Sequence, residues 1–149
     1  MARVLAVALL LGLVSVAAAA DLPDPKLTPG AVTTLTLPEI CSRHWGRDHR
    51  HVTPAMKREV LAKYPGTKCR PDKHGRRVEI DHLISRELGG ADAVDNLWKQ
   101  CYAGEWNATQ KDKLENRLHK EVCAGRLGLE EARAKIRMNW ISVYREFYP

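Results

Sequence analysis

The sequence predicts a small α+β domain that is richer in helix than in strand and is cross-linked by two disulfides. Two long stretches near the C-terminus carry apolar residues at helical spacing. Two short apolar runs flank a Gly-Gly pair in the middle of the chain, as the strands of a hairpin do. The four cysteines, an even number, complete the pattern of a small exported domain.

Residues 1–20 read MARVLAVALLLGLVSVAAAA, which is the pattern of a secretory signal peptide cleaved before Asp21. The apolar run is too short for a membrane anchor, which needs about 20 apolar residues. No later segment is apolar enough to span a bilayer. We therefore expect a secreted or periplasmic protein that has no contact with the membrane after cleavage.

Residues 21–40 contain four prolines and no clear period, which predicts an extended or mobile lead-in to a domain over residues 41–149. Within the domain, Thr53 and Pro54 are good first residues of a helix. Apolar side chains then recur at spacing four as far as Tyr64, and the next two residues are Pro and Gly.

The strand candidates are the runs 78–84 and 96–100. A long helix is predicted from Asn107 to about residue 124, and a second from residue 129 to about residue 148. The apolar stripe of the second helix consists of Ala132, Ile136, Trp140, Val143, Tyr144 and Phe147.

Charge is uneven along the chain. Removal of residues 1–20 takes away one of the 24 basic residues and none of the 18 acidic ones, so the formal net charge falls from +6 to +5. The stretch between Cys41 and Arg77 holds eleven basic residues against three acidic ones, which is consistent either with a polyanion partner or with a solvated surface. The cluster His44, His49 and His51 with Asp48 has irregular spacing, so we expect it to face solvent or nucleic acid rather than a metal.

The cysteines allow three pairings. The sequence contains no C-x-x-C pair, so a zinc knuckle is not expected. Cys69 and Cys101 bracket the predicted hairpin, whose ends must lie close together. This favours the pair Cys69–Cys101 and leaves Cys41–Cys123.

Asp81 and His82 stand side by side where the first predicted strand runs out. Adjacent side chains of a strand point to opposite faces. One can therefore bind a Mg²⁺ ion, which takes few protein oxygens, while the other activates a water molecule as a general base. Cleavage of a phosphodiester needs both tasks.

The order Asp81-His82, Gly89-Gly90, Asp95-Asn96-Leu97 and then a polar helix resembles the HNH endonucleases of the His-Me finger, or ββα-metal, class. The longer run from EIDHLISRELGG through DNLW to NATQKDKLENRLHKEVCAG is similar to small exported HNH-type proteins of bacteria. The resemblance covers roughly residues 78–120. It implies a ββα-metal frame and hydrolysis of nucleic acid with Mg²⁺, or alternatively Mn²⁺, as the cofactor.

The resemblance implies a role for each matching residue. His82 corresponds to the general base, Asp81 to a metal-binding carboxylate, and Asn96 to the asparagine that braces the loop and helps to orient the base. The second metal ligand comes from the helix, and Asn107 has about the right separation from His82. Asn107 is also an excellent helix cap, and His119, three turns further along, is a competing ligand.

Lys111, Arg76 and Arg77 are the candidates for phosphate contacts, although Lys111 is as readily explained as a solvated side chain. The predicted function is an exported, metal-dependent HNH-type endonuclease. The alternative is a non-catalytic, disulfide-linked binding protein that keeps the frame and has lost turnover. The choice between DNA and RNA and the oligomeric state stay open at this point.

Overall fold

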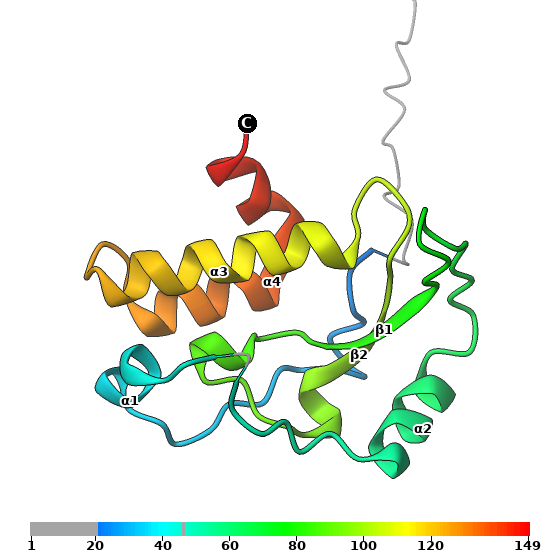
Figure 1. The fold of residues 1–149 in the computed structure, drawn as a ribbon, viewed down its shortest axis with the longest axis horizontal. Coiled ribbons are helices and arrows are strands. Elements are labelled where there is room, and N and C mark those ends of the chain that lie inside the picture. The colour runs from blue at the N-terminus through cyan, green and yellow to red at the C-terminus, as the bar shows by residue number, and fades with distance from the viewer. Residues whose placement is uncertain (1–20, 46) are drawn as a thin grey trace, which may run out of the picture.

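The computed structural model describes residues 21–149 apart from residue 46. These residues contain four α-helices and one two-stranded sheet (Figure 1). The signal peptide expected in residues 1–20 lies outside this part of the chain. The mixed helix and strand content confirms the predicted α+β class. The elements in chain order are α1 (Leu37–Ser42), α2 (Pro54–Lys63), β1 (Val78–His82), the 3₁₀ turns η1 (Arg86–Leu88) and η2 (Val94–Asn96), β2 (Leu97–Cys101), α3 (Ala108–Cys123) and α4 (Leu129–Phe147).

Strands β1 and β2 pair in antiparallel fashion, with Asp81 opposite Trp98 and His82 opposite Leu97. β1 ends two residues before the predicted boundary. The reason is that the backbone N–H and C=O of Ile84 bond to the side chain of Asn96 rather than to a strand partner. The chain therefore leaves the sheet directly after His82.

The predicted helix starts are confirmed by their capping contacts. The hydroxyl of Thr53 accepts a hydrogen bond from the backbone N–H of Met56 (3.2 Å), so α2 begins at Pro54. The side chain of Asn107 accepts from the backbone N–H of Gln110 (3.2 Å), and the Gln110 side chain accepts from the Asn107 N–H (3.0 Å). This reciprocal capping box satisfies two donors that the first turn of α3 leaves unpaired.

Helix α4 is kinked, whereas the sequence predicted one uninterrupted helix. Asn139 has non-helical backbone angles (φ −165°, ψ 90°), and its side chain accepts a hydrogen bond from the N–H of Ser142 (3.0 Å). An asparagine side chain competes with the backbone for such donors, so Asn139 caps a new helical segment. Figure 1 shows the last turns bending away from the axis of the first part.

Helices α3 and α4 lie alongside each other and cover one side of the hairpin, while α2 lies near its other side (Figure 1). The core between them contains the fully buried rings of Trp98 and Trp140 together with Leu114, Leu118 and Ile136. Burial of such side chains is the main stabilising contribution. None of the described helices is long and apolar enough to cross a membrane.

The lead-in was expected to be extended or mobile. Residues 21–36 have little regular structure, and they are anchored to the domain at Thr28, which is fully buried and whose hydroxyl bonds to the backbone oxygen of Leu97 (3.0 Å) and to the Tyr64 hydroxyl (2.7 Å). Helix α1 was not predicted at all. The Glu39 carboxylate accepts from the backbone N–H of Thr36 (2.7 Å), which is the contact that starts this short helix.

Both predicted disulfides are present. Cys41–Cys123 joins α1 to the end of α3, and Cys69–Cys101 joins the loop before β1 to the end of β2. Each link closes a long loop, which reduces the entropy of the unfolded chain.

Candidate active site

Asp81 and His82 are both buried at the end of β1, with 7% and 4% of their surfaces exposed. They are adjacent residues of an extended strand and so face opposite sides of it. Burying a carboxylate or an imidazole costs free energy unless partners are supplied. Both side chains therefore need hydrogen-bond or ion-pair partners.

His82 is paired with Asp92, which sequence reasoning missed. Nε2 of His82 lies 2.7 Å from Oδ1 of Asp92. The other oxygen of Asp92 accepts a hydrogen bond from the backbone N–H of His51 (2.6 Å), and Nε of Arg86 lies 3.5 Å from Oδ1. A neutral His82 that donates through Nε2 keeps Nδ1 as its proton acceptor.

The charge states of the pair follow from burial and from these contacts. Burial lowers the pKa of His82 to about 4, against the attraction of Asp81 and Asp92. Burial opposes ionisation of Asp92, but hydrogen bonds from His51 and His82 lower its pKa overall. His82 is therefore a neutral imidazole beside an ionised carboxylate at pH 7.

The turn between His82 and Asp92 depends on two glycines and on Asn96. Gly89 has a left-handed conformation (φ 78°), and a Cβ on Gly90 would lie 1.8 Å from the backbone oxygen of Ile84. The Asn96 side chain accepts from the N–H of Ile84 (2.9 Å) and donates to the carbonyls of Ile84 (2.9 Å) and Ala91 (3.1 Å). These contacts are those of a brace that holds the loop.

Lys111 is fully buried rather than solvated. Its Nζ donates to Oδ2 of Asp81 (2.8 Å), to the backbone oxygen of His82 (2.5 Å) and to the carboxylate of Glu115. The three contacts match the three donors of an ammonium group. Burial opposes the charged form, but attraction by Asp81 and Glu115 raises the pKa of Lys111, so it stays a cation.

A cavity of about 280 Å³ opens beside Asp81 and His82 and is rich in carboxylates. Helix α3 contributes Asp112, Glu115 and Asn116 to its lining. Burial raises the pKa of Asp112 to about 6, helped by repulsion from Asp81 and Glu79. Burial also raises the pKa of Glu115. The cavity lining therefore holds more carboxyl groups than basic side chains, because Arg86 is the one arginine or lysine among its described lining residues and Lys111 contacts two of the carboxylates without lining the cavity.

This donor set fits a hydrated hard cation held by one or two carboxylates. Asp81 uses Oδ2 for Lys111 and retains Oδ1, and no hydrogen bond or ion pair to another described residue engages the Asp112 carboxylate. Mg²⁺ prefers such oxygens and keeps several of its waters. Asp81 with Asp112 is the pair best suited to hold it. The described residues bring no three carboxylates or histidines here close enough for a closed cage.

Asn107, the ligand suggested by the HNH spacing, lies elsewhere. Its side chain caps α3 and donates to the backbone oxygen of Gly104 (3.1 Å). It lines a separate hollow together with Arg76 and Tyr102. The structure thus matches the capping interpretation and does not bring Asn107 into the cavity of Asp81.

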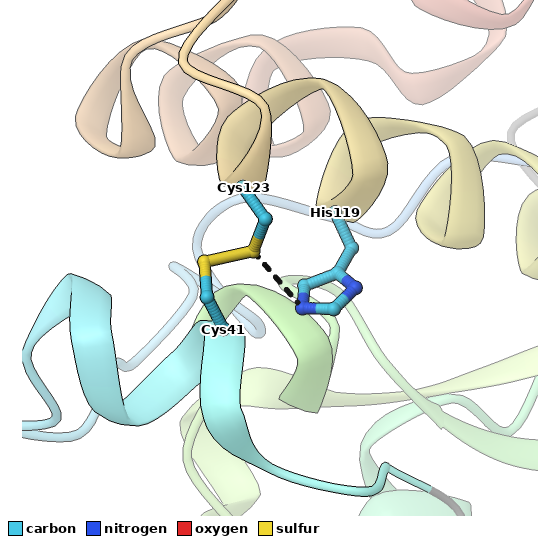
Figure 2. A group of neighbouring side chains, drawn as sticks. All are labelled: Cys41, His119 and Cys123. Carbon is cyan, nitrogen blue, oxygen red and sulfur yellow. Dashed lines mark hydrogen bonds between the residues drawn. A yellow bond between two sulfur atoms is a disulfide. The ribbon is translucent and has the colours of Figure 1, made fainter.

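His119, the competing candidate, is also outside the cavity. Its Nε2 lies 3.4 Å from Sγ of Cys123 (Figure 2) and 3.4 Å from the backbone oxygen of Ile40. It therefore belongs to the surroundings of the Cys41–Cys123 disulfide.

The predicted phosphate-binding arginines lie on the loop before β1 and are exposed. Arg76 pairs with Asp72 (2.8 Å) and stacks 4.0 Å from the Tyr102 ring centroid, while Arg77 donates to the backbone oxygen of Cys69. In the histidine cluster, the rings of His49 and His51 are 4.6 Å apart, and neither belongs to a described group that could hold a metal.

Comparison of the chain with protein-family models, with curated proteins and with solved structures finds no match.

Proposed function

We propose that the protein is an exported, metal-dependent nuclease of the HNH type that hydrolyses phosphodiester bonds. The observation that carries the proposal is the His82–Asp92 pair, which lies beside a carboxylate-lined cavity where β1 ends. An imidazole held by a carboxylate is a suitable general base. The order β1, β2 and α3, with Asn96 bracing the turn, agrees with the ββα frame that the resemblance implies.

In the proposed mechanism, Nδ1 of His82 accepts a proton from the attacking water. Asp92 fixes the ring through Nε2 and stabilises the imidazolium that forms. Lys111 holds Asp81 in place by an ion pair within a buried environment. When bound at Asp81 and Asp112, a Mg²⁺ ion supplies charge stabilisation to the phosphate and the leaving oxygen.

Basic residues of the stretch 41–77 provide the phosphate contacts in this proposal, with Arg86 at the edge of the cavity. No described element presents an evident base-reading motif, so binding is expected to involve mainly phosphates.

A second candidate is a nucleic-acid- or partner-binding protein without turnover. The observation that favours it is the buried ammonium of Lys111, which already occupies Asp81 and Glu115. A resident cation of this kind satisfies the acidic side chains without any metal.

Cleavage assays separate the two candidates. Protein comprising residues 21–149 is incubated with plasmid, single-stranded DNA and RNA in the presence of Mg²⁺, of Mn²⁺ or of a chelator. The nuclease proposal expects cleavage of at least one substrate that the chelator abolishes. Binding without cleavage under all conditions would favour the second candidate, and full cleavage in chelator would reject the metal.

A further inference from the structure

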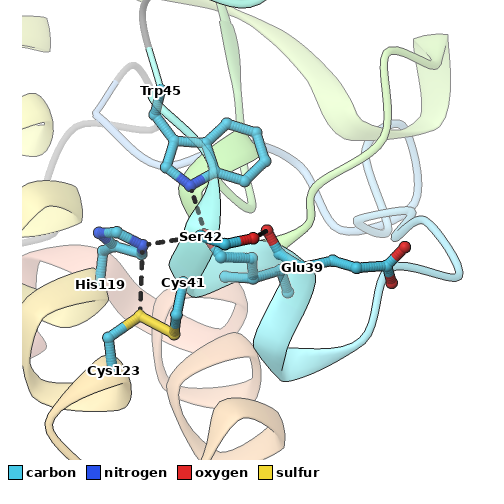
Figure 3. The surroundings of a disulfide bond; sticks show 7 residues. Glu39, Cys41, Ser42, Trp45, His119 and Cys123 are labelled. Carbon is cyan, nitrogen blue, oxygen red and sulfur yellow. Dashed lines mark hydrogen bonds between the residues drawn. A yellow bond between two sulfur atoms is a disulfide. The ribbon is translucent and has the colours of Figure 1, made fainter.

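The Cys41–Cys123 disulfide has a histidine beside it that the proposed nuclease chemistry does not use. Figures 2 and 3 show His119 pointing at the disulfide from α3, with Cys41 reaching it from α1. Nε2 of His119 lies 3.4 Å from Sγ of Cys123. The two sulfurs and the imidazole nitrogen all lie within 4.8 Å of one another.

The spacing of these three residues is compatible with a metal site. His119 and Cys123 are four residues apart on α3, so they project from the same face of the helix. Cys41 approaches that face from the end of α1. A zinc ion binds thiolates at about 2.3 Å and imidazole at about 2.0 Å. Ligand atoms within 4.8 Å of one another can reach such an ion after small side-chain rotations.

A carboxyl group lies near the imidazole. Glu87 interacts electrostatically with both His119 and Lys120, and its buried Oε2 has no hydrogen-bond partner among the described residues. In the oxidised state this cluster is nevertheless no site for zinc, because the lone pairs of a disulfide are poor ligands and the thiolate is the form that binds metals.

We propose that reduction of the Cys41–Cys123 disulfide converts this cluster into a zinc site with two thiolates, the His119 imidazole and one water as ligands. The disulfide and the zinc ion are then alternative ways to join α1 to α3. The inference is independent of the proposed nuclease activity.

The conversion balances with a phosphine as the reductant. The phosphine and one water reduce the disulfide to two thiols, and the phosphorus is oxidised to a phosphine oxide. Zinc then binds both sulfurs and His119, and the two thiol protons pass to solvent.

The zinc-bound state keeps α1 in place under reducing conditions. The segment after α1 carries Trp45, which lies near the disulfide (Figure 3). Its Nε1 donates to the backbone oxygen of Ile40 (2.8 Å), and Trp45 lines the carboxylate cavity.

The second disulfide is an internal control. Cys69 and Cys101 are joined in the same way, but they belong to no described group of three metal ligands. Reduction exposes all four thiols, whereas a zinc ion should select one pair.

The experiment uses residues 21–149 reduced with a water-soluble phosphine in the absence of oxygen. Co²⁺ is added first, because thiolate ligation gives a charge-transfer absorption that carboxylate sites do not give. Zn²⁺ is then added in competition with a chromophoric chelator, and the thiols are alkylated and mapped by mass spectrometry. The variants are His119→Ala and, as a matched control, His74→Ala.

The proposal expects one thiolate-bound metal per reduced chain and none in the oxidised chain. It also expects zinc to protect Cys41 and Cys123 from alkylation while Cys69 and Cys101 react. His119→Ala should weaken zinc binding by at least about tenfold, and His74→Ala should leave it unchanged. Equal alkylation of all four cysteines, an unchanged affinity in His119→Ala, or a reduced chain that stays unfolded with zinc present would overturn the proposal.

Discussion

Asp92 fixes the orientation of the His82 ring by its contact with Nε2. No contact among the described residues engages the other ring nitrogen, Nδ1. The carboxylate is itself fixed by the backbone N–H of His51 and by Arg86. A base that is oriented in this way loses little entropy when it accepts a proton. The orientation of His82 therefore depends on a residue ten positions further along the chain, in the loop between η1 and η2.

Replacing Asp92 with Asn should reduce cleavage by roughly ten- to a hundredfold, because the neutral amide no longer stabilises an imidazolium at His82. The pH profile of cleavage should shift as well, which a purely structural defect would not cause. Asp95→Asn is the matched control, since Asp95 is exposed and pairs only at 3.6 Å with Lys63. Equal rates in the two variants would argue against the dyad.

His82 should also make stability depend on pH. The pKa of His82 is about 4 in the folded state against 6.5 for an ordinary histidine. As the pH falls, the unfolded chain therefore binds this proton at a higher pH than the folded chain does. Stability from this group is fully present above pH 6.5 and is lost as the pH falls toward 4, by on the order of 3 kcal/mol.

Denaturant unfolding at pH 7 and at pH 4.5, without divalent cations, measures this loss. Asp112 makes the free energy of unfolding change in the opposite direction, because its pKa is raised and acidification therefore stabilises the folded state at this group. Comparison of the wild type with His82→Gln isolates the contribution of His82. The variant should lose less stability on acidification, while His74→Ala should behave like the wild type. Identical losses in wild type and His82→Gln would contradict the description of His82.

At the scale of single elements, the start of α3 tests the role of Asn107. Asn107→Ala removes the cap and should cost about 1 kcal/mol in the free energy of unfolding. Asn107→Asp keeps an acceptor for the Gln110 N–H and should cost less. Because Asn107 does not line the cavity of Asp81, both variants should cleave normally at a temperature where they are folded. A large loss of cleavage in Asn107→Ala would instead restore Asn107 as a ligand.

Local signals in the sequence were sufficient for several elements. Thr53 and Asn107 begin helices because their side chains satisfy nearby N–H groups, and this chemistry is written in a few adjacent residues. The two disulfides followed from the hairpin that Cys69 and Cys101 bracket. Helix capping depends on neighbours in the chain, whereas the disulfide pairing depended on recognising the hairpin.

Contacts between residues far apart in the chain could not be predicted from the sequence. Asp92 carries no local mark that distinguishes it from a solvated aspartate, and only the fold brings it to His82. Lys111 is buried because Asp81 and Glu115 surround it, although lysine is ordinarily exposed. Asn139 interrupts α4 inside a strong apolar stripe, so periodicity alone could not reveal the kink.

At the scale of the whole molecule, the basic excess should govern binding to nucleic acid. Affinity for a single-stranded oligonucleotide, measured in chelator, should fall steeply with salt. Arg77→Gln should weaken binding and reduce the salt slope by about one, whereas Lys135→Gln on α4, where the lysine pairs with Glu146, should change neither. A salt-independent affinity would rule out phosphate-driven binding.

The most direct test of the account is the rate of cleavage by His82→Ala relative to the wild type, under single-turnover conditions with Mg²⁺. Circular dichroism of both proteins must first show the same fold. The rate of the variant should be at least about a hundredfold lower, which is the usual contribution of a general base, and neither protein should cleave in chelator. A His82→Ala protein that cleaves at the wild-type rate would contradict the assignment of this site.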